Sequence, residues 1–336
     1  MSKPEDVFTR YQLTLEKQMR AVTVTAEAGE KRLSIVECDP PESTSSEVTV
    51  AVKAFSLNNG EIRGALAAPA GYRPGWDFAG IVESAPTGSP FTQGDRVAGL
   101  KFEGAWAERV VVAPRLLAAV PDEVSLEVAA TLPVAGVTAL LALSKKSVGR
   151  AQKVLVTAAT GGVGMFAIQL AAVAGAHVTA YVRKEADASL LSSLGADCVA
   201  IGEDEALRRG PYDLILDGVG GRFLGTLLQC LAPRGVCVQF GDAGGEELTT
   251  FDAKLFRLGS GGAFGGTSLY GFFLIEELTR DESGGAGPHL DQLLSLLRTG
   301  LLTSIIDRTQ SWHDIDEVAR ALMKRRFKGK AVLRID

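Results

Sequence analysis

A strand, a glycine turn and a helix follow one another over residues 153–174, and this order constrains the fold more than any other feature. The run Lys153-Val154-Leu155-Val156 is apolar and β-branched, which predicts a buried parallel strand. Glycines occupy 161, 162 and 164, and an apolar helix begins at about Met165. Glycines let the backbone approach a ligand, and a helix N-terminus attracts anions. The stretch therefore predicts a phosphate cradle that binds a dinucleotide.

Length and composition bound the class of protein. With 336 residues the chain is long enough for two domains, each with its own core. It is 46% hydrophobic and 22% charged with a net charge of −5, so neither nucleic acid nor an anionic membrane is expected as a partner. No run approaches the length of a membrane span. The four scattered cysteines predict free thiols and a cytoplasmic location.

The pattern of residues changes along the chain. Residues 1–18 are polar and predict an N-terminal tail. Over 19–138 short alternating strands separated by glycines predict a partly open antiparallel β-barrel. Over 139–270 strands alternate with helices, which predicts a doubly wound parallel sheet. Residues 271–336 are expected to return to the first domain.

Individual elements follow from the same patterns. In the barrel we expect strands at 48–54, 78–83, 96–100 and 108–112. In the parallel sheet we expect five strands, at 153–159, 177–182, 198–201, 213–218 and 235–240. Helices are expected at about 270–280, 289–299 and 313–324, before a last strand at 329–335.

The end of the second parallel strand bears on the choice of dinucleotide. An NAD site places a carboxylate at this point to bind the ribose 2′-hydroxyl. Here the strand His177–Val182 ends in Arg183 and Lys184, and two cations suit a 2′-phosphate. We therefore predict NADPH as the cofactor, with a solvated pair at a strand end as the alternative.

The sequence shows neither a set of metal ligands nor the motif of a catalytic nucleophile. A zinc site needs three or four converging ligands, but the histidines at 177, 289 and 313 lie on different predicted elements and the cysteines do not cluster. The chain has no G-x-S-x-G elbow. It also lacks the Tyr-x-x-x-Lys of short-chain dehydrogenases. We therefore predict no metal site.

Eight segments, in order, resemble the medium-chain dehydrogenase/reductases, and within them the zinc-independent quinone oxidoreductase (zeta-crystallin-like) branch. They are Ser56–Glu61, Pro74–Gly80, Gly94–Val97, Leu132–Ala139, Ala158–Gly164, Leu214–Gly221, Phe240–Gly241 and Gly329–Leu333. The resemblance runs from Met19 to the C-terminus. It implies a GroES-like catalytic barrel into which the Rossmann sheet is inserted. The zinc-dependent branch carries Gly-His-Glu where this chain has Gly75-Trp76-Asp77, in agreement with the prediction of no metal.

The resemblance also implies which residues bind the cofactor. Its pyrophosphate would be held by the cradle residues Gly161, Gly162, Val163 and Gly164. Thr138 would face the phosphate and ribose, and Lys330 would reach the phosphates. Phe240 with Gly241, and Phe264 with Gly265 and Gly266, would flank the nicotinamide. Arg183 and Lys184 would bind the 2′-phosphate.

Three further positions concern the substrate. By resemblance, Asn58 lies beside the nicotinamide and the substrate. Tyr72 is a candidate proton donor to a developing enolate, and the alternative is an aromatic ring that packs under its loop beside Trp76. Asp242 stands where Asn or Ser is usual, and either favours a cationic or hydroxylated substrate or caps a loop.

Together these implications predict an NADPH-dependent, zinc-free reductase that transfers hydride to a quinone or an α,β-unsaturated carbonyl compound. A tailoring reductase of a biosynthetic pathway is a variant that the sequence does not separate. The alternative class is a non-catalytic NADPH-binding scaffold, or crystallin-like, member of the same family. We also expect a homodimer with a small-molecule quinone or enone substrate.

Overall fold

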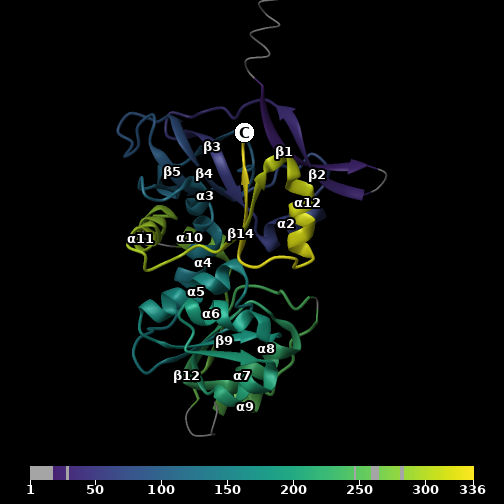
Figure 1. Ribbon diagram of the computed structural model, residues 1–336, viewed down its shortest axis with the longest axis vertical. Coiled ribbons are helices and arrows are strands. Elements are labelled where there is room, and N and C mark those ends of the chain that lie inside the picture. The colour runs from purple at the N-terminus through teal and green to yellow at the C-terminus, as the bar shows by residue number, and fades with distance from the viewer. Residues whose placement is uncertain (1–17, 28–29, 246, 259–264, 281–283) are drawn as a thin grey trace, which may run out of the picture.

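The computed structural model describes residues 18–27, 30–245, 247–258, 265–280 and 284–336. Figure 1 shows two parts along the long axis, one with β1 to β5, α2 and α12, the other with β9, β12 and the helices α5 to α9. The predicted tail, apart from Gln18, and the predicted site residue Phe264 lie outside the described residues.

The first part is built on a seven-stranded sheet in the order β14-β15-β3-β4-β5-β7, with β6 paired to β3. Its neighbours are antiparallel except β14 and β15, which run parallel. The strands are β3 (Val48–Ser56), β4 (Asp77–Ser84), β5 (Arg96–Leu100), β6 (Arg109–Val112), β7 (Leu117–Ala119), β14 (Ile306–Ser311) and β15 (Lys330–Arg334). A separate hairpin is formed by β1 (Met19–Glu27) and β2 (Glu30–Cys38).

Close packing inside this sheet depends on a missing side chain. A Cβ at Gly80 on β4 would lie 2.1 Å from the carbonyl oxygen of Ala51 on β3, so only glycine fits. Phe55 stacks on Trp106 with ring centroids 5.4 Å apart, and both are fully buried. The helices around the sheet are α2 (Asn59–Ala67), α3 (Leu126–Ala129), α11 (Gly287–Arg298) and α12 (Ile315–Met323).

The second part is a six-stranded parallel sheet in the order β10-β9-β8-β11-β12-β13. Its strands are β8 (Lys153–Val156), β9 (His177–Val182), β10 (Cys198–Ile201), β11 (Tyr212–Asp217), β12 (Leu231–Gln239) and β13 (Ser268–Gly271). The helices are α5 (Gly162–Val173), α6 (Ala188–Ser193), α7 (Glu203–Arg209), α8 (Gly221–Leu227) and α9 (Ala253–Leu258). The predicted fold class is confirmed: a parallel Rossmann sheet stands beside a GroES-like barrel.

Four details of the predicted elements were wrong. The parallel sheet has a sixth strand, β13, and the helix expected from residue 270 begins only at Leu274 (α10, Leu274–Arg280). Strand β14 was not predicted. The first parallel strand ends at Val156 because Ala158, with φ of 48°, already lies in the left-handed region that starts the turn.

A long apolar helical segment, Leu126–Ser144, connects the two parts. It comprises α3, the π-helical turn η2 (Leu132–Gly136) and α4 (Val137–Ser144). By length and composition its 19 residues could cross a membrane, contrary to the sequence prediction, but 72% of the apolar window is buried inside the protein. Its apolar side chains are therefore core between the two parts.

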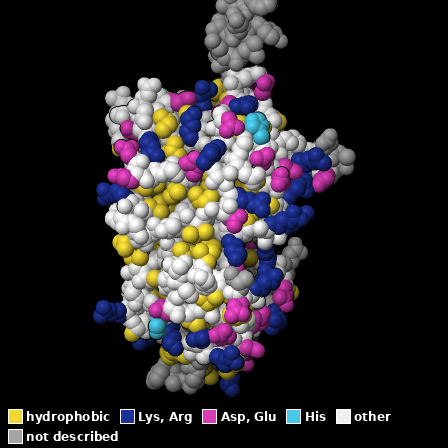
Figure 2. Space-filling model, in the orientation of Figure 1, with side chains coloured by type: hydrophobic (Ala, Val, Ile, Leu, Met, Phe, Trp, Pro, Cys, Tyr) yellow, Lys and Arg dark blue, Asp and Glu magenta, His cyan; other side chains and the backbone are white. Residues whose placement is uncertain are grey.

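Charged side chains of both signs alternate over the visible surface. In Figure 2 the Lys and Arg side chains are interspersed with Asp and Glu, and no field of a single sign covers this face. The face therefore shows no extended basic patch of the kind that binds nucleic acid.

Candidate active site

A cluster of buried polar side chains lies where the barrel strands meet the cofactor turn. It consists of Asn58 at the N-cap of α2, Glu61 in the first turn of α2, Asp77 at the start of β4 and Lys330 at the start of β15. Asp77 is 0% exposed, and Glu61 and Lys330 are each 3% exposed. Three ionisable groups out of contact with water must satisfy one another.

Asp77 is the best satisfied member of this buried cluster. Its Oδ1 accepts from the backbone N–H of Val134, at 2.7 Å. Its Oδ2 accepts from Ser56 Oγ at 2.5 Å, from Asn58 Nδ2 at 2.8 Å and from Lys330 Nζ at 3.4 Å. Both carboxyl oxygens of Asp77 are therefore occupied by donors.

The amine of Lys330 also points into the cluster. Its three hydrogens face Leu57 O at 3.0 Å, Asn58 Oδ1 at 2.7 Å and Asp77 Oδ2 at 3.4 Å. Burial lowers the pKa of Lys330, against the opposite effect of the nearby carboxyls of Asp77 and Glu61. The amine thus holds barrel residues in this structure, and only the aliphatic stem of Lys330 borders the cofactor turn.

The side-chain amide of Asn58 is engaged on both sides. Its oxygen accepts from Lys330, and its two N–H hydrogens are directed at Asp77, at 2.8 Å, and at Glu61 Oε2, at 3.3 Å. An amide carries two N–H hydrogens, so the remaining capacity is an acceptor lone pair on Oδ1. In this arrangement Asn58 can accept a hydrogen bond from a hydroxyl but has no hydrogen left for a carbonyl.

Glu61 is the least satisfied member. Its Oε2 accepts from Asn58 N at 3.2 Å and from Asn58 Nδ2, whereas its buried Oε1 has no hydrogen-bond partner. Burial first, and then the charge of Asp77, raises the pKa of Glu61 well above its usual range. Sequence reasoning did not single out Glu61, although a Glu three residues after an Asn cap is the signal of a capping box.

The glycine turn after β8 has the geometry of a phosphate cradle. A Cβ at Gly164 would lie 2.5 Å from Ala158 O and 2.8 Å from Ala159 Cα, so the helix can approach the strand only with glycine there. The N-cap of α5, Gly161, offers no side-chain cap. The backbone N–H groups of that first turn, which includes Gly162 and Val163, therefore face the position of an anion.

The turn is joined to the last strand. Gly161 forms a parallel bridge with Gly329, and the N–H of Gly329 donates to Thr160 O at 2.8 Å. A Cβ at Gly162 would lie 2.6 Å from Cδ of Lys330, so the lysine stem crosses the turn. The cofactor turn and the buried cluster thus share one residue, Lys330.

A second set of contacts fixes the ends of the neighbouring strands. Asp217, at the end of β11, accepts from Thr157 Oγ1 at 2.6 Å and from Gly220 N at 2.8 Å. A Cβ at Gly218 would lie 2.8 Å from the ring of Phe240, which packs across it after β12. Phe240 and Gly241 therefore lie beside the cradle, at the carboxyl edge where α/β sheets bind ligands.

Arg183 and Lys184 follow β9 as expected, and both are exposed. The charges of Arg183 and Arg222 both lower the pKa of Tyr181, although burial raises it overall. Arg222 itself pairs with Glu203 at 3.1 Å. Sequence reasoning overlooked Arg222, a third cation at this corner.

The remaining predicted cofactor residues are spread around the turn. Thr138 is buried on α4. Gly266 has a φ of 83°, and a Cβ there would lie 3.3 Å from Cγ of Arg234. Val163 is half-buried. The structure brings together the cradle glycines, Val163 and Lys330.

Tyr72 lies on the loop before β4 and is half-buried against the core, as is Trp76. Burial, followed by the charges of Glu103 and Glu61, raises the pKa of the Tyr72 phenol. The phenol is therefore protonated at neutral pH, and Glu61 is close enough to act on it electrostatically.

Asp242 pairs with Arg63 of α2 at 2.5 Å, which sequence reasoning did not foresee. The pair connects the loop after β12 in the Rossmann part with the first helix of the barrel part. Asp242 is thus neither a simple loop cap nor an unpaired carboxylate in this structure.

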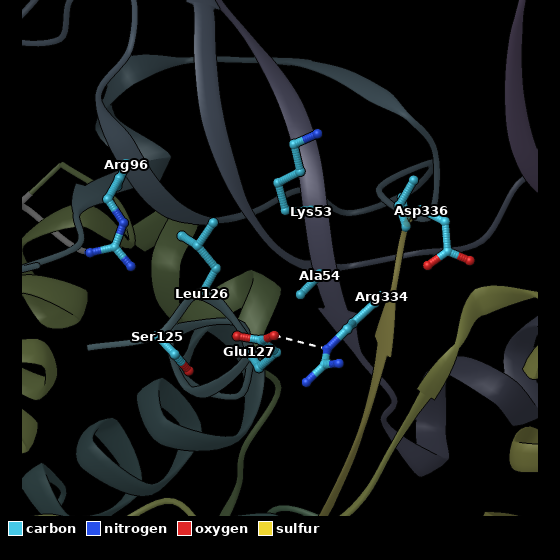
Figure 3. A pocket seen from close by; sticks show the side chains of 9 residues that line it. Lys53, Ala54, Arg96, Ser125, Leu126, Glu127, Arg334 and Asp336 are labelled. Carbon is cyan, nitrogen blue, oxygen red and sulfur yellow. Dashed lines mark ion pairs between the residues drawn. The ribbon is translucent and has the colours of Figure 1, made fainter. Parts of the chain in front are cut away.

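Among the described residues no group of three or more His, Cys, Asp or Glu side chains could hold a metal ion. A pocket of about 350 Å³ lies at the end of β15, where Arg334 pairs with Glu127 at 2.9 Å (Figure 3). No residue of the buried cluster or the glycine turn lines it.

A parallel sheet with a glycine turn, set beside a mostly antiparallel barrel, defines a two-domain dinucleotide-binding class of protein. Family models agree with this class. "Alcohol dehydrogenase GroES-like domain" matches residues 44–122, and "Zinc-binding dehydrogenase" matches residues 162–281.

Relatives of known name refine the family. A chloroplastic quinone-oxidoreductase QR1 of Triphysaria versicolor is 33% identical over 65% of this chain and 69% of its own. The highly reducing polyketide synthase Dhc3 of Alternaria cinerariae is 30% identical over 86% of this chain, which spans 12% of that protein. The solved structure of a mycobacterial protein complexed with NADPH has a TM-score of 0.80 and 26% identity, covering 94% of this chain and 99% of that one.

The chain belongs to the medium-chain dehydrogenase/reductases and is quinone oxidoreductase-like. The resemblance predicted from its motifs is confirmed.

Proposed function

We propose that the chain is an NADPH-dependent oxidoreductase that reduces a small quinone or α,β-unsaturated carbonyl compound. One observation carries the proposal: the glycine turn that would hold the cofactor is bonded to Gly329, and the next residue, Lys330, enters the buried cluster around Asn58. Gly329 and Lys330 thereby connect the cofactor cradle to the candidate substrate residues.

The residues present fit a dinucleotide. The uncapped first turn of α5 provides backbone N–H groups for the pyrophosphate, and Gly164 keeps that turn close to β8. Arg183 and Lys184 would bind the 2′-phosphate, and the solved relative with NADPH supports this choice of cofactor. When bound, NADPH supplies the hydride from C4 of its nicotinamide.

The protein's own task is to position the acceptor and to provide a proton. Reduction of a quinone or an enone adds one hydride and one proton, and hydride transfer leaves negative charge on the carbonyl oxygen. The half-buried, protonated Tyr72 is the candidate donor to that charge. Asn58, with its free acceptor lone pair, would bind a hydroxyl of the cofactor or the substrate.

Independence of zinc is part of the proposal. The amide of Asn58 lies against the carboxylate of Asp77, at 2.8 Å, and Trp76 directly precedes Asp77 in the sequence. Neither an amide nor an indole is a preferred zinc ligand, and Asp77 already accepts four hydrogen bonds.

A homodimer is also proposed. Within the described residues β13 is hydrogen-bonded on one side only, to β12, and its Leu269 is 42% exposed. Phe273, just beyond it, is 59% exposed. An apolar edge strand readily pairs with another strand, and a second copy of the chain offers the same edge. Sedimentation at several concentrations would test this, with monomer throughout as the contrary result.

A cytoplasmic location completes the proposal. All four cysteines are free thiols in the structure, which suits a reducing compartment. Fractionation of cells that express the tagged chain would test it.

A tailoring reductase of a biosynthetic pathway is a second candidate. The match to a polyketide synthase over 86% of this chain favours it. Steady NADPH oxidation measured with a panel of quinones and enones, including enoyl thioesters, would separate these substrate classes. Tight NADPH binding without consumption of any of them would instead identify the non-catalytic scaffold.

A further inference from the structure

We propose that Glu61 carries a proton on Oε1 at neutral pH, and that this neutral carboxyl is a positioning residue whose ionisation weakens cofactor binding. The inference goes beyond the proposed function in assigning this role to Glu61, and its cofactor-binding half rests on that function.

The buried cluster contains one cation, Lys330, and two carboxyls, Glu61 and Asp77, all at most 3% exposed. With both carboxyls ionised the cluster would hold an uncompensated negative charge away from water, which is costly. One proton on one carboxyl removes that charge.

The two carboxyls differ in their hydrogen-bond partners. Asp77 accepts four hydrogen bonds, from Ser56, Asn58, Val134 and Lys330. Glu61 accepts two, both from Asn58 and both longer than 3.1 Å, and they fall on one oxygen. The other oxygen, Oε1, is buried without a partner. An ionised Glu61 would leave a charged oxygen buried without a donor, whereas a neutral carboxyl leaves only an uncharged group unpartnered, which costs less.

Charged groups around Glu61 support the same assignment. Asp77 from β4 raises the pKa of Glu61, whereas Lys330 from β15 lowers it, and burial outweighs both. Tyr72 faces it from the loop before β4. On α12, which packs against α2, Asp316 pairs with Arg320, and Arg320 also pairs with Glu30. Among these groups Lys330 is the cation that acts on Glu61.

Glu61 is connected to the cofactor turn through Lys330. If Glu61 ionises, it repels Asp77 and competes for the amine of Lys330, which now binds Asn58 at 2.7 Å. The stem of Lys330 crosses Gly162, and Gly329 is bonded to the cradle at Thr160. Displacement of Lys330 would therefore disturb the turn that holds the pyrophosphate.

The test compares the wild type with Glu61→Gln, a neutral side chain of the same shape, and with Glu123→Gln, an exposed control. The dissociation constant for NADPH, measured by fluorescence from pH 6 to 10, should rise by up to tenfold per pH unit above the pKa of Glu61 in the wild type and the control. In Glu61→Gln this rise should be absent. A rise of the same size in Glu61→Gln would overturn the connection to the cofactor.

Stability of the cofactor-free protein provides a second readout. A carboxyl whose pKa is raised on folding binds more protons folded than unfolded, so the unfolding free energy falls as pH increases from its ordinary pKa to the raised one. Glu61→Gln should lack this fall. If Glu61→Gln lacks this fall in unfolding free energy but the wild type does not bind NADPH, the proposed function is refuted. The assignment of a proton to Glu61 would still hold.

If Glu61→Gln does not fold, infrared spectroscopy of the wild type shows whether a protonated carboxyl is present. Absorption of a protonated carboxyl at pH 7 that disappears at alkaline pH is expected. Its absence at pH 7 would overturn the proposal.

Discussion

Arg63 and Asp242 form an ion pair across the junction of the two parts, with Arg63 Nη1 2.5 Å from Asp242 Oδ2. Arg63 comes from α2, two residues after Glu61, and Asp242 comes from the loop after β12, two residues after Phe240. Its side chains are 43% and 58% exposed. The pair therefore links the two candidate halves of the active site through solvent-accessible charges.

Removing this pair should change cofactor exchange more than stability. Exposed ion pairs contribute roughly 0.2–1 kcal/mol, and salt screens them. We expect Asp242→Asn to release NADPH severalfold faster than the wild type at low salt, with the difference gone at about 1 M salt. Stopped-flow fluorescence measures the rate. Glu276→Gln, which breaks the surface pair with Arg280, is the matched control and should leave release unchanged.

The choice of NADPH over NADH should depend on Arg183 and Lys184. Replacing both with Ala is expected to weaken NADPH binding by about 1–3 kcal/mol for each lost charge-assisted contact, with NADH nearly unaffected. Titration calorimetry with both cofactors provides the comparison. Equal losses for the two cofactors would contradict the assignment of these cations to the 2′-phosphate. Arg222→Ala would show whether the third cation adds to the effect.

Catalysis is expected to be independent of metal. Dialysis against a chelator should leave turnover and melting temperature unchanged. Elemental analysis should find far less than one zinc per chain. Stoichiometric zinc, or activity restored by added zinc, would contradict the proposal.

Position 164 should not tolerate even the single methyl group of alanine. In Gly164→Ala the new Cβ would lie 2.5 Å from Ala158 O, so the turn must open and NADPH affinity should fall at least tenfold. Gly64→Ala on α2 has open space around the new methyl and serves as the control. That variant should bind normally and gain about 0.5–1 kcal/mol of stability. Normal binding by Gly164→Ala would mean that the turn is not the cradle.

Tyr72→Phe separates two roles of one side chain. Phe keeps the packing of the ring against the core and removes only the hydroxyl. A fall in kcat of about 10²-fold or more at unchanged melting temperature would identify the proton donor. Unchanged kcat would leave water as the proton source and Tyr72 as a packing residue.

Local patterns predicted much of the fold, because the strands and helices of the Rossmann part carry their own periodicity. Strand β13 was missed because its four residues, Ser268–Gly271, run into the helical pattern of α10. Its identity as a strand depends on pairing with β12, which lies about 30 residues earlier in the chain.

The candidate site was predicted less completely, for a related reason. The expectation that Lys330 reaches the cofactor phosphates stays a prediction, and its motif gives no indication that the amine also bonds Asn58. That contact depends on the pairing of β15 with β3, between Val332 and Ser56. Asn58→Ala would therefore leave Lys330 and Asp77 short of partners and should cost about 1–3 kcal/mol of stability besides any loss of turnover.

The backbone bonds at Gly329 have a mechanical consequence. They connect the cofactor turn to the last strand of the barrel, and the side chain of Gln169 on α5 adds two hydrogen bonds to the backbone of Thr303. By contrast, the ion pairs Arg63 with Asp242 and Lys328 with Asp187 join flexible side chains. A rotation that separates the two parts while these backbone bonds stay intact must have its axis near Gly161. The turn that would hold the pyrophosphate then barely moves during such a rotation, and the widening occurs at the Arg63 side. The amide of Gly329 should accordingly resist hydrogen exchange even while the two parts open and close.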